Sequence, residues 1–339
     1  MRPKTRVTIQ DVAARAGVSV ATISKVINGR YGVSADTNAR VQAVMEEMGY
    51  EASLVARSLR NHSTNVIGVL VADFDPFSTE LIRGVADAIH GTGFDLVVYS
   101  ASGRSGDRTG WERRYLSRLG GTLLDGAVLV TPTILDVPRG SPVVAVDPRT
   151  GPTDLPTIDS DNLRGARTAT EHLLHLGHRK IAMLSGRPEL RSAQLRLKGY
   201  RRALAAAGVP VDERLVQIGP YSPDVPLAPT RRLLESDDRP TAIFASSDVS
   251  ALAAMELAAQ VGLNVPSDLS VVGFDNIPES AITSPPLTTI SQPIRQMGQR
   301  AIDLLVKLIH GEPPKATHIT LSTTLIVRHS TCEPKDLTP

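Results

Sequence analysis

The sequence of 339 residues has few of the residues that define several large protein classes. It contains one cysteine, Cys332, so it can form neither an internal disulfide nor a cluster of thiolate metal ligands. No run of eighteen apolar residues occurs, and the basic N-terminus is not followed by an apolar segment, which predicts neither a membrane-spanning helix nor a secretory signal. These absences predict a protein of a reducing, cytoplasmic compartment.

The charge is small overall but unevenly distributed. Hydrophobic residues make up 41% and charged residues 21%, as in ordinary globular proteins, and the length allows two or three domains. Residues 1–62 hold nine Lys or Arg and five Asp or Glu, a net charge of +4, whereas the remainder carries −2. A small basic unit joined to a slightly acidic one indicates either a unit that binds a polyanion or a solvated basic face.

The first fifty residues predict three short helices. Thr8 and Asp11 form a capping box that begins a helix over residues 9–16, and Gly17 ends it. Ser19 begins a second helix over residues 20–27, and Ser34 begins a third that ends at Gly49.

The second of these helices has two different faces. Its apolar residues, such as Ile23 and Val26, are spaced to pack against the first helix, and the opposite side is small, polar and basic. Two short helices joined by three residues, with a third completing a core, form either a helix-turn-helix or a helical hairpin without a DNA role. The polar face carries Ala21, Thr22, Ser24, Lys25 and Asn28.

The residues of this region resemble those of a known family. The runs VTIQDVAARAGVS at 7–19 and TISKVIN at 22–28, followed by Val33-Ser34, are similar to the N-terminus of the lactose-repressor (LacI) family of bacterial transcription factors. The resemblance implies that Val20, Ala21 and Lys25 read base edges. It also implies that the DNA backbone is contacted by Thr8, Thr22, Ser24, Asn28 and Ser34.

The segment SLVARSLR at 53–60 resembles the hinge helix of the same family. Leu59 occupies the position of the leucine that is inserted into the minor groove, and Arg57 and Arg60 flank it. The usual Pro-Asn pair before this helix is replaced by Ala52-Ser53. From the residues alone, a polar linker with one incidental leucine remains an alternative.

From residue 65 onward, apolar runs alternate with helical patterns, which predicts an α/β fold with two doubly wound lobes. This matches the periplasmic-binding-protein type of core that the LacI family carries, with crossings between lobes near Ser160, Ser291 and Leu321. The domains are predicted as residues 1–62 for DNA binding with the hinge, and 63–339 for ligand binding and dimerisation. Strands are expected at 66–71, 96–99, 127–130, 143–146, 180–184, 242–245 and 269–274, and helices near 163–176, 198–207 and 249–261.

No nucleotide-binding, esterase or zinc-protease motif occurs, so no cofactor, metal or catalytic residue is expected. His172, His175 and His178 are interpreted as surface histidines at a helix end, because their spacing drifts around the helix. The resemblance supplies ligand-binding residues instead: Arg196 as a bidentate anchor and Asp275 as an acceptor. It also suggests Phe77, Tyr221 and Ser247, although Phe77 and Tyr221 also suit a core and Ser247 a helix cap.

The sequence therefore predicts a sequence-specific DNA-binding regulator, most simply a repressor. It is expected to act as a homodimer on a near-palindromic operator, because each subunit contributes one recognition helix. A small effector, by analogy a sugar, is expected to bind between the lobes and to alter operator affinity. The alternatives are a cytoplasmic solute-binding protein, a purine-responsive corepressed regulator and, least favoured, an enzyme.

Overall fold

The computed structural model describes residues 7–27, 31–50, 63–101, 110–120, 123–133, 137, 141–150, 155–219, 227–312 and 316–335. The chain forms two compact units that divide near Asn65. No helix among the described residues is long and apolar enough to cross a membrane.

The first unit contains three helices around one small core. Its helices are α1 (Ile9–Ala16), α2 (Val20–Ile27) and α3 (Ala35–Glu47), and the first two have the predicted bounds. Val12, Ile23 and Val41 come from different helices, and each is fully buried. Gly17 takes a left-handed conformation with φ 65°, which ends α1 and turns the chain toward α2. The helix-turn-helix arrangement is therefore present.

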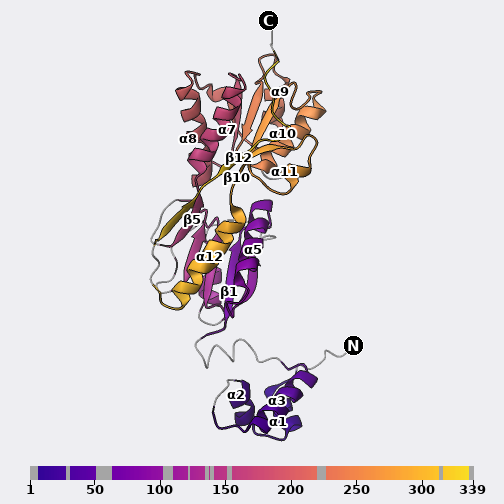
Figure 1. The fold of residues 1–339 in the computed structure, drawn as a ribbon, viewed down its shortest axis with the longest axis vertical. Coiled ribbons are helices and arrows are strands. Elements are labelled where there is room, and N and C mark those ends of the chain that lie inside the picture. The colour runs from indigo at the N-terminus through magenta and orange to yellow at the C-terminus, as the bar shows by residue number, and fades with distance from the viewer. Residues whose placement is uncertain are drawn as a thin grey trace. The chain divides into compact units, whose positions relative to one another are not determined.

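The second unit consists of two lobes, each built on a six-stranded sheet (Figure 1). The first-lobe sheet has the order β11-β5-β4-β3-β1-β2 and is parallel throughout. The second-lobe sheet has the order β12-β10-β9-β8-β6-β7, and only β12 runs antiparallel to its neighbour. The strands are β1 (Val66–Val71), β2 (Asp95–Ser100), β3 (Gly126–Val130), β4 (Val143–Val146), β5 (Thr157–Ser160), β6 (Ile181–Ser185), β7 (Val216–Ile218), β8 (Ala242–Ala245), β9 (Ser270–Asp275), β10 (Thr288–Ser291), β11 (His318–Leu321) and β12 (Thr324–Ile326).

Helices cover both faces of each sheet. In the first lobe, α5 and α12 pack on one face and α6 on the other. In the second lobe, α7 and α8 cover one face and α9 and α10 the other. The bounds of the helices are α5 (Pro76–Ile89), α6 (Trp111–Leu119), α7 (Asn162–His175), α8 (Arg191–Ala206), η1 (Glu213–Leu215), α9 (Ala228–Glu235), α10 (Asp248–Gln260), α11 (Glu279–Ile282) and α12 (Ile294–Ile309).

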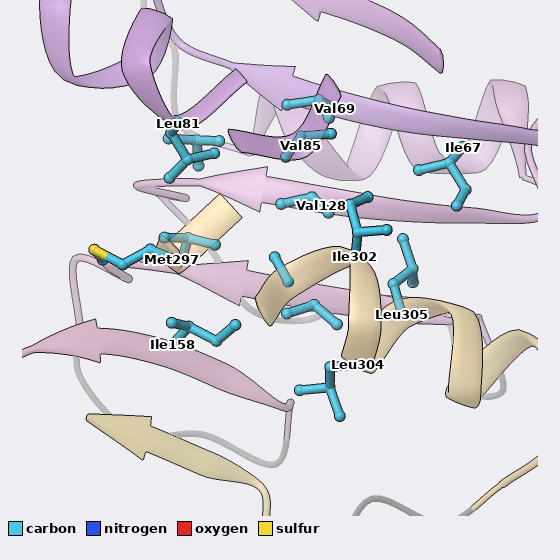
Figure 2. Packing of buried hydrophobic residues seen from close by; sticks show 14 of the residues in the cluster. Ile67, Val69, Leu81, Val85, Val128, Ile158, Met297, Ile302, Leu304 and Leu305 are labelled. Atoms are coloured by element: carbon cyan, nitrogen blue, oxygen red, sulfur yellow. The ribbon is translucent and has the colours of Figure 1, made fainter. Parts of the chain in front are cut away.

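The first-lobe core forms between one face of the sheet and two helices that cross closely. Figure 2 shows Leu81 and Val85 of α5 and Met297 and Ile302 of α12 among the buried strand residues. Small residues permit this close approach, because a Cβ atom placed on Gly84 would lie 2.1 Å from the carbonyl oxygen of α12 residue 295. Glycine at position 84 is therefore a packing requirement.

The chain crosses between the lobes three times, near the residues predicted. It leaves the first lobe after Ser160 at the end of β5, and returns after Ser291 at the end of β10. The third crossing runs from Leu321 of β11 to Thr324 of β12. The candidate ligand site lies at these crossings, where the carboxyl ends of β4, β5, β8, β9 and β10 meet α7 and α8.

Candidate functional site

The polar face of α2 is the candidate nucleic-acid surface of the first unit. Ile23 and Val26 are buried, whereas Ala21 and Lys25 are exposed and Val20 is 40% exposed. These residues lie on one face, where the small side chains of Val20 and Ala21 leave the helix backbone close to any surface that it contacts. An α-helix of this kind fits the major groove of B-form DNA.

Three of the four hydroxyl groups predicted to contact a DNA backbone lie at or near helix N-termini, and the fourth, Ser24, is the fifth residue of α2. Thr8 caps α1 in a complete capping box, with its backbone N–H 2.8 Å from Asp11 Oδ2. Ser34 caps α3 by accepting from the backbone N–H of residue 37 at 3.3 Å. Thr22 Oγ1 lies 2.9 Å from Ser19 Oγ, at the start of α2. Exposed helix N-termini attract anions such as phosphate, so these positions suit backbone contacts.

In the second unit, Arg196 of α8 lies at the centre of the candidate ligand site. The residue is 8% exposed, and its guanidinium carbon lies 3.8 Å from the centre of the Phe274 ring. Nε donates to Asn162 Oδ1 at 2.8 Å, and Nη1 donates to the carbonyl of Ser246. These contacts fix the plane of the guanidinium, as a bidentate anchor requires.

Asp275, at the end of β9, pairs with this arginine. Its Oδ1 lies 3.6 Å from Arg196 Nη1 and accepts a hydrogen bond from Gln292 Nε2 at 2.6 Å. Among the described residues, neither Arg196 Nη2 nor Asp275 Oδ2 has a hydrogen-bond partner. This leaves the N–H groups of Arg196 Nη2 and the oxygen Oδ2 of Asp275 available to a bound molecule. Arg196 and Asp275 together are called the ligand anchor below.

Asp248 lies beneath the ligand anchor and supports its backbone. Asp275 and Asn276 have φ of 119° and 60°, values that L-residues rarely adopt. The fully buried Asp248 accepts from the backbone N–H of Ile277 at 2.9 Å and from Thr289 Oγ1 at 2.5 Å. These contacts hold the turn after β9, and with it Asp275, in this conformation.

Burial changes the protonation of these carboxyl groups. Desolvation raises the pKa of Asp275 to about 6, although the Arg196 charge opposes the shift. Desolvation and the Asp275 charge raise the pKa of Asp248 to about 8. This raised pKa favours the protonated form of Asp248. The ligand anchor then carries one positive guanidinium and one carboxylate.

The first lobe contributes residues from the end of β4. Asp147 Oδ2 accepts from Ser192 Oγ of α8 at 3.3 Å, and the backbone N–H of Arg191 donates to the carbonyl of Arg149 at 2.9 Å. Desolvation raises the pKa of Asp147, and the Arg196 charge opposes this shift. Groups from both lobes therefore lie around the ligand anchor.

Phe77 and Ser247, which were also predicted to bind the ligand, make contacts within their own lobes. Phe77 of α5 packs against the first-lobe core, and Ser247 caps α10 by accepting from the backbone N–H of Ser250 at 3.2 Å. Both placements match the alternatives drawn from the sequence, a core residue and a helix cap. Asn28, Leu59 and Tyr221 lie outside the described residues.

Two of the three histidines near the end of α7 have protein partners, and the third, His175, is exposed as predicted. His178 is buried between Thr241 Oγ1 at 2.8 Å and the carbonyl of Cys332 at 2.9 Å, and His172 Nε2 lies 3.1 Å from Thr331 Oγ1. His178 is therefore a core residue, contrary to the prediction of a surface position. The prediction was wrong because the C-terminal segment covers this end of the second-lobe sheet, and sequence periodicity carries no information about that segment.

Several residues of the ligand site are absent from the sequence prediction. Asn162, Asp147, Ser246 and Gln292 are neighbours of the anchor through tertiary contacts alone. One indication was available for three of them. Asp147, Ser246 and Gln292 each directly follow a strand, and the carboxyl ends of parallel strands are where such folds bind ligands.

Comparison with known families gives two matches that divide the chain in the same way as its architecture. The family described as "Bacterial regulatory proteins, lacI family" matches residues 8–53. A periplasmic binding protein-like domain matches residues 170–331. The first match covers the three-helix unit and the second lies within the two-lobed unit.

Individual relatives match over nearly the whole chain. The HTH-type transcriptional repressor PurR of Photobacterium profundum is 35% identical, over 95% of this chain and 98% of its own length. The HTH-type transcriptional regulator CelR of Thermobifida fusca is also 35% identical, over 97% and 100%. Among solved structures, the lac repressor dimer bound to operator and the anti-inducer ONPF has a TM-score of 0.80, with 30% identity over 97% and 100% of the chains. A CelR–cellobiose complex has a TM-score of 0.70, with 34% identity over 96% and 100%.

Proposed function

Because this chain belongs to the lacI family of bacterial regulatory proteins, we propose that it is an operator-binding repressor controlled by a small molecule at the ligand anchor. The observation that carries the proposal is the occurrence in one chain of an exposed polar recognition face and a buried anchor with an available donor and acceptor. The role is binding and not catalysis. Operator binding places the protein in the compartment of the chromosome.

The DNA contacts of the proposal are assigned by position on α2. Val20 and Ala21 face the bases, and Lys25 reaches a base edge or a phosphate. The protein acts as a homodimer, so that two copies of α2 read the two halves of a near-palindromic site. Leu59 is proposed as the minor-groove wedge of the hinge.

The proposed effector is a sugar. A solved regulator of this fold, CelR, is described with cellobiose bound, and another from Enterococcus faecium is described with ribose bound. A guanidinium donor beside a carboxylate acceptor suits adjacent hydroxyl groups, each of which both donates and accepts. A purine base offers a similar set of donors and acceptors, and it is the alternative effector.

The test is selection of tight binders from a random pool of DNA duplexes by the purified full-length protein, at several salt concentrations. We expect convergence on a palindrome whose affinity falls steeply as salt rises, because phosphate contacts release counterions. Leu59→Ala should weaken binding to the selected site more than binding to random DNA. Failure to converge, both alone and with cellobiose, ribose or hypoxanthine added, would refute the regulator proposal.

The anchor is tested with the selected operator. Effector screening uses release of the operator by cellobiose, ribose and hypoxanthine, followed by the same titration with Arg196→Ala. We expect the variant to bind the operator and to lose the response to the effector. Arg202→Ala, an exposed position on the same helix, is the matched control. A full response from Arg196→Ala would remove the anchor assignment.

A further inference from the structure

The ligand anchor is part of a ring of polar contacts, made of four hydrogen bonds and one ion pair. Its members are Ser160, Asn162, Arg196, Asp275 and Gln292, and none is more than 8% exposed. On one side, Ser160 Oγ donates to Gln292 Oε1, and Gln292 Nε2 donates to Asp275 Oδ1 at 2.6 Å. On the other side, Arg196 Nε donates to Asn162 Oδ1 at 2.8 Å, and Asn162 Nδ2 donates to the Ser160 carbonyl at 3.1 Å. The Arg196–Asp275 pair closes the ring.

The ring lies where the chain crosses between the lobes. Ser160 is the last residue of β5, and Gln292 follows β10, so each stands at one crossing. The third crossing lies beside the ring. Asp161, which directly follows Ser160, donates its backbone N–H to the carbonyl of Leu321, where that crossing begins, at 2.9 Å. Movement of the lobes must change the backbone at these crossings. The ring therefore connects the ligand anchor to the segments that such a movement deforms.

The chemistry of Gln292 fixes the direction of its two hydrogen bonds. A carboxylate only accepts, so the amide Nε2 must face Asp275 and the amide oxygen must face the Ser160 hydroxyl. A bound hydroxyl group that donates to Asp275 competes with Gln292 for this carboxylate. Any rotation of the amide away from Asp275 also moves its oxygen away from Ser160.

We propose that Gln292 is the positioning residue that transmits occupancy of the ligand anchor to the β5 crossing at Ser160. The inference rests on the proposed function in one respect, the binding of a ligand at the anchor. The second path, through Arg196 and Asn162, includes the 3.6 Å ion pair, which is longer than a hydrogen bond. The path through Gln292 consists of one side chain and two direct hydrogen bonds.

The test is a set of double-mutant cycles that needs neither ligand nor DNA. Asp275→Asn removes the charge that a ligand would engage, and Ser160→Ala removes the hydroxyl at the crossing. The unfolding equilibrium constant of the full chain is measured by urea titration for each single variant and for the pair. The cycle is then repeated with Gln292→Met, which cuts one path, and with Asn162→Ala, which cuts the other.

We expect the effect of Ser160→Ala on the unfolding constant to change about threefold or more when Asp275→Asn is present, as for residues that share a hydrogen-bond network. This coupling should disappear with Gln292→Met and persist with Asn162→Ala. If the Gln292→Met variant does not fold, the Gln292→Glu variant takes its place. A glutamate keeps the oxygen that accepts from Ser160 and lacks the N–H group that donates to Asp275. Additive effects in the original protein, or coupling that survives Gln292→Met, would overturn the proposal. The cycle uses no DNA, so its outcome is independent of the DNA selection. Failure of this inference and failure of the proposed function can therefore be distinguished.

Discussion

The most informative perturbation of the fold is Asp248→Asn, because this carboxyl group is buried and has no cationic partner among the residues that the structure describes. Asp248 accepts from the N–H of Ile277 and, when ionised, also from Thr289 Oγ1. When Asp248 is protonated, its O–H can instead donate to Thr289 Oγ1, and an asparagine amide makes the same two contacts. The substitution therefore preserves the hydrogen bonds and removes only the ability to ionise. It isolates the contribution of one group to the pH dependence of stability.

The sign and size of that contribution follow from the shifted pKa. Asp248 has a pKa of about 8 in the folded state, against 3.8 as its ordinary value, so between these values the folded chain holds a proton that the unfolded chain has lost. Its stabilising contribution is complete below the lower pKa and is lost as pH rises through the upper one. Over the two pH units from 5 to 7 the free energy of unfolding should fall by about 3 kcal/mol on account of this group.

The assay is urea unfolding of the full-length protein at pH 5, 6 and 7 and constant ionic strength, followed by circular dichroism. Asp248→Asn should reduce the slope of unfolding free energy against pH by about 1.4 kcal/mol per unit. Asp87→Asn, at an exposed position of α5, is the matched control for the loss of a carboxyl group. An unchanged slope in Asp248→Asn would show that the group is ionised in the folded protein, and the reasoning would be refuted.

Three further predictions concern local packing and capping. Thr8→Ala should destabilise α1 by about 1 kcal/mol through loss of the capping box, seen as faster amide exchange over residues 9–16, whereas Thr8→Ser should not. Gly84→Ala places a methyl group against the α12 backbone and should cost about 1–3 kcal/mol in thermal unfolding, with Asp87→Ala as the neutral comparison. Ser330→Ala removes the acceptor of the buried Thr288 N–H at 2.8 Å and should cost about 1–3 kcal/mol in urea unfolding; no loss would imply that water replaces the hydroxyl.

Helix boundaries were predictable where a side chain marks them. α1 and α2 begin after Thr8 and Ser19, whose hydroxyls accept backbone hydrogen bonds, and both were predicted with the observed bounds. α8 begins at Arg191, seven residues before the predicted start near 198, because Leu190 precedes it without a side-chain cap. The physical cause is that tertiary packing of α7 and α8, and not a local cap, determines where α8 begins.

Fully buried strands could be predicted from the sequence, whereas partly exposed edge strands could not. The buried runs of β1, β4 and β8 stand out as continuous apolar segments, and their bounds were found. The edge strands β7, β11 and β12 have three or four residues each and no continuous buried run, so hydrophobicity does not distinguish them from loops.

The candidate site was predictable in part. Arg196 and Asp275 were found through resemblance, and the structure brings their charged groups within 3.6 Å. Asn162 and Gln292 reach the same place from other elements. A polar residue beside a strand or in a first helical turn is common, so only the fold distinguishes these two from other polar residues.

The positive φ of Asp275 affects which residues this position of the backbone accepts. Glycine adopts φ 119° without the cost that a side chain incurs, roughly 1–3 kcal/mol for residues held in such regions. Aspartate at this position therefore opposes the conformational preference of its own backbone. Asp275→Gly would relieve that cost and, under the proposed function, would give a regulator that folds and binds DNA but no longer senses its ligand.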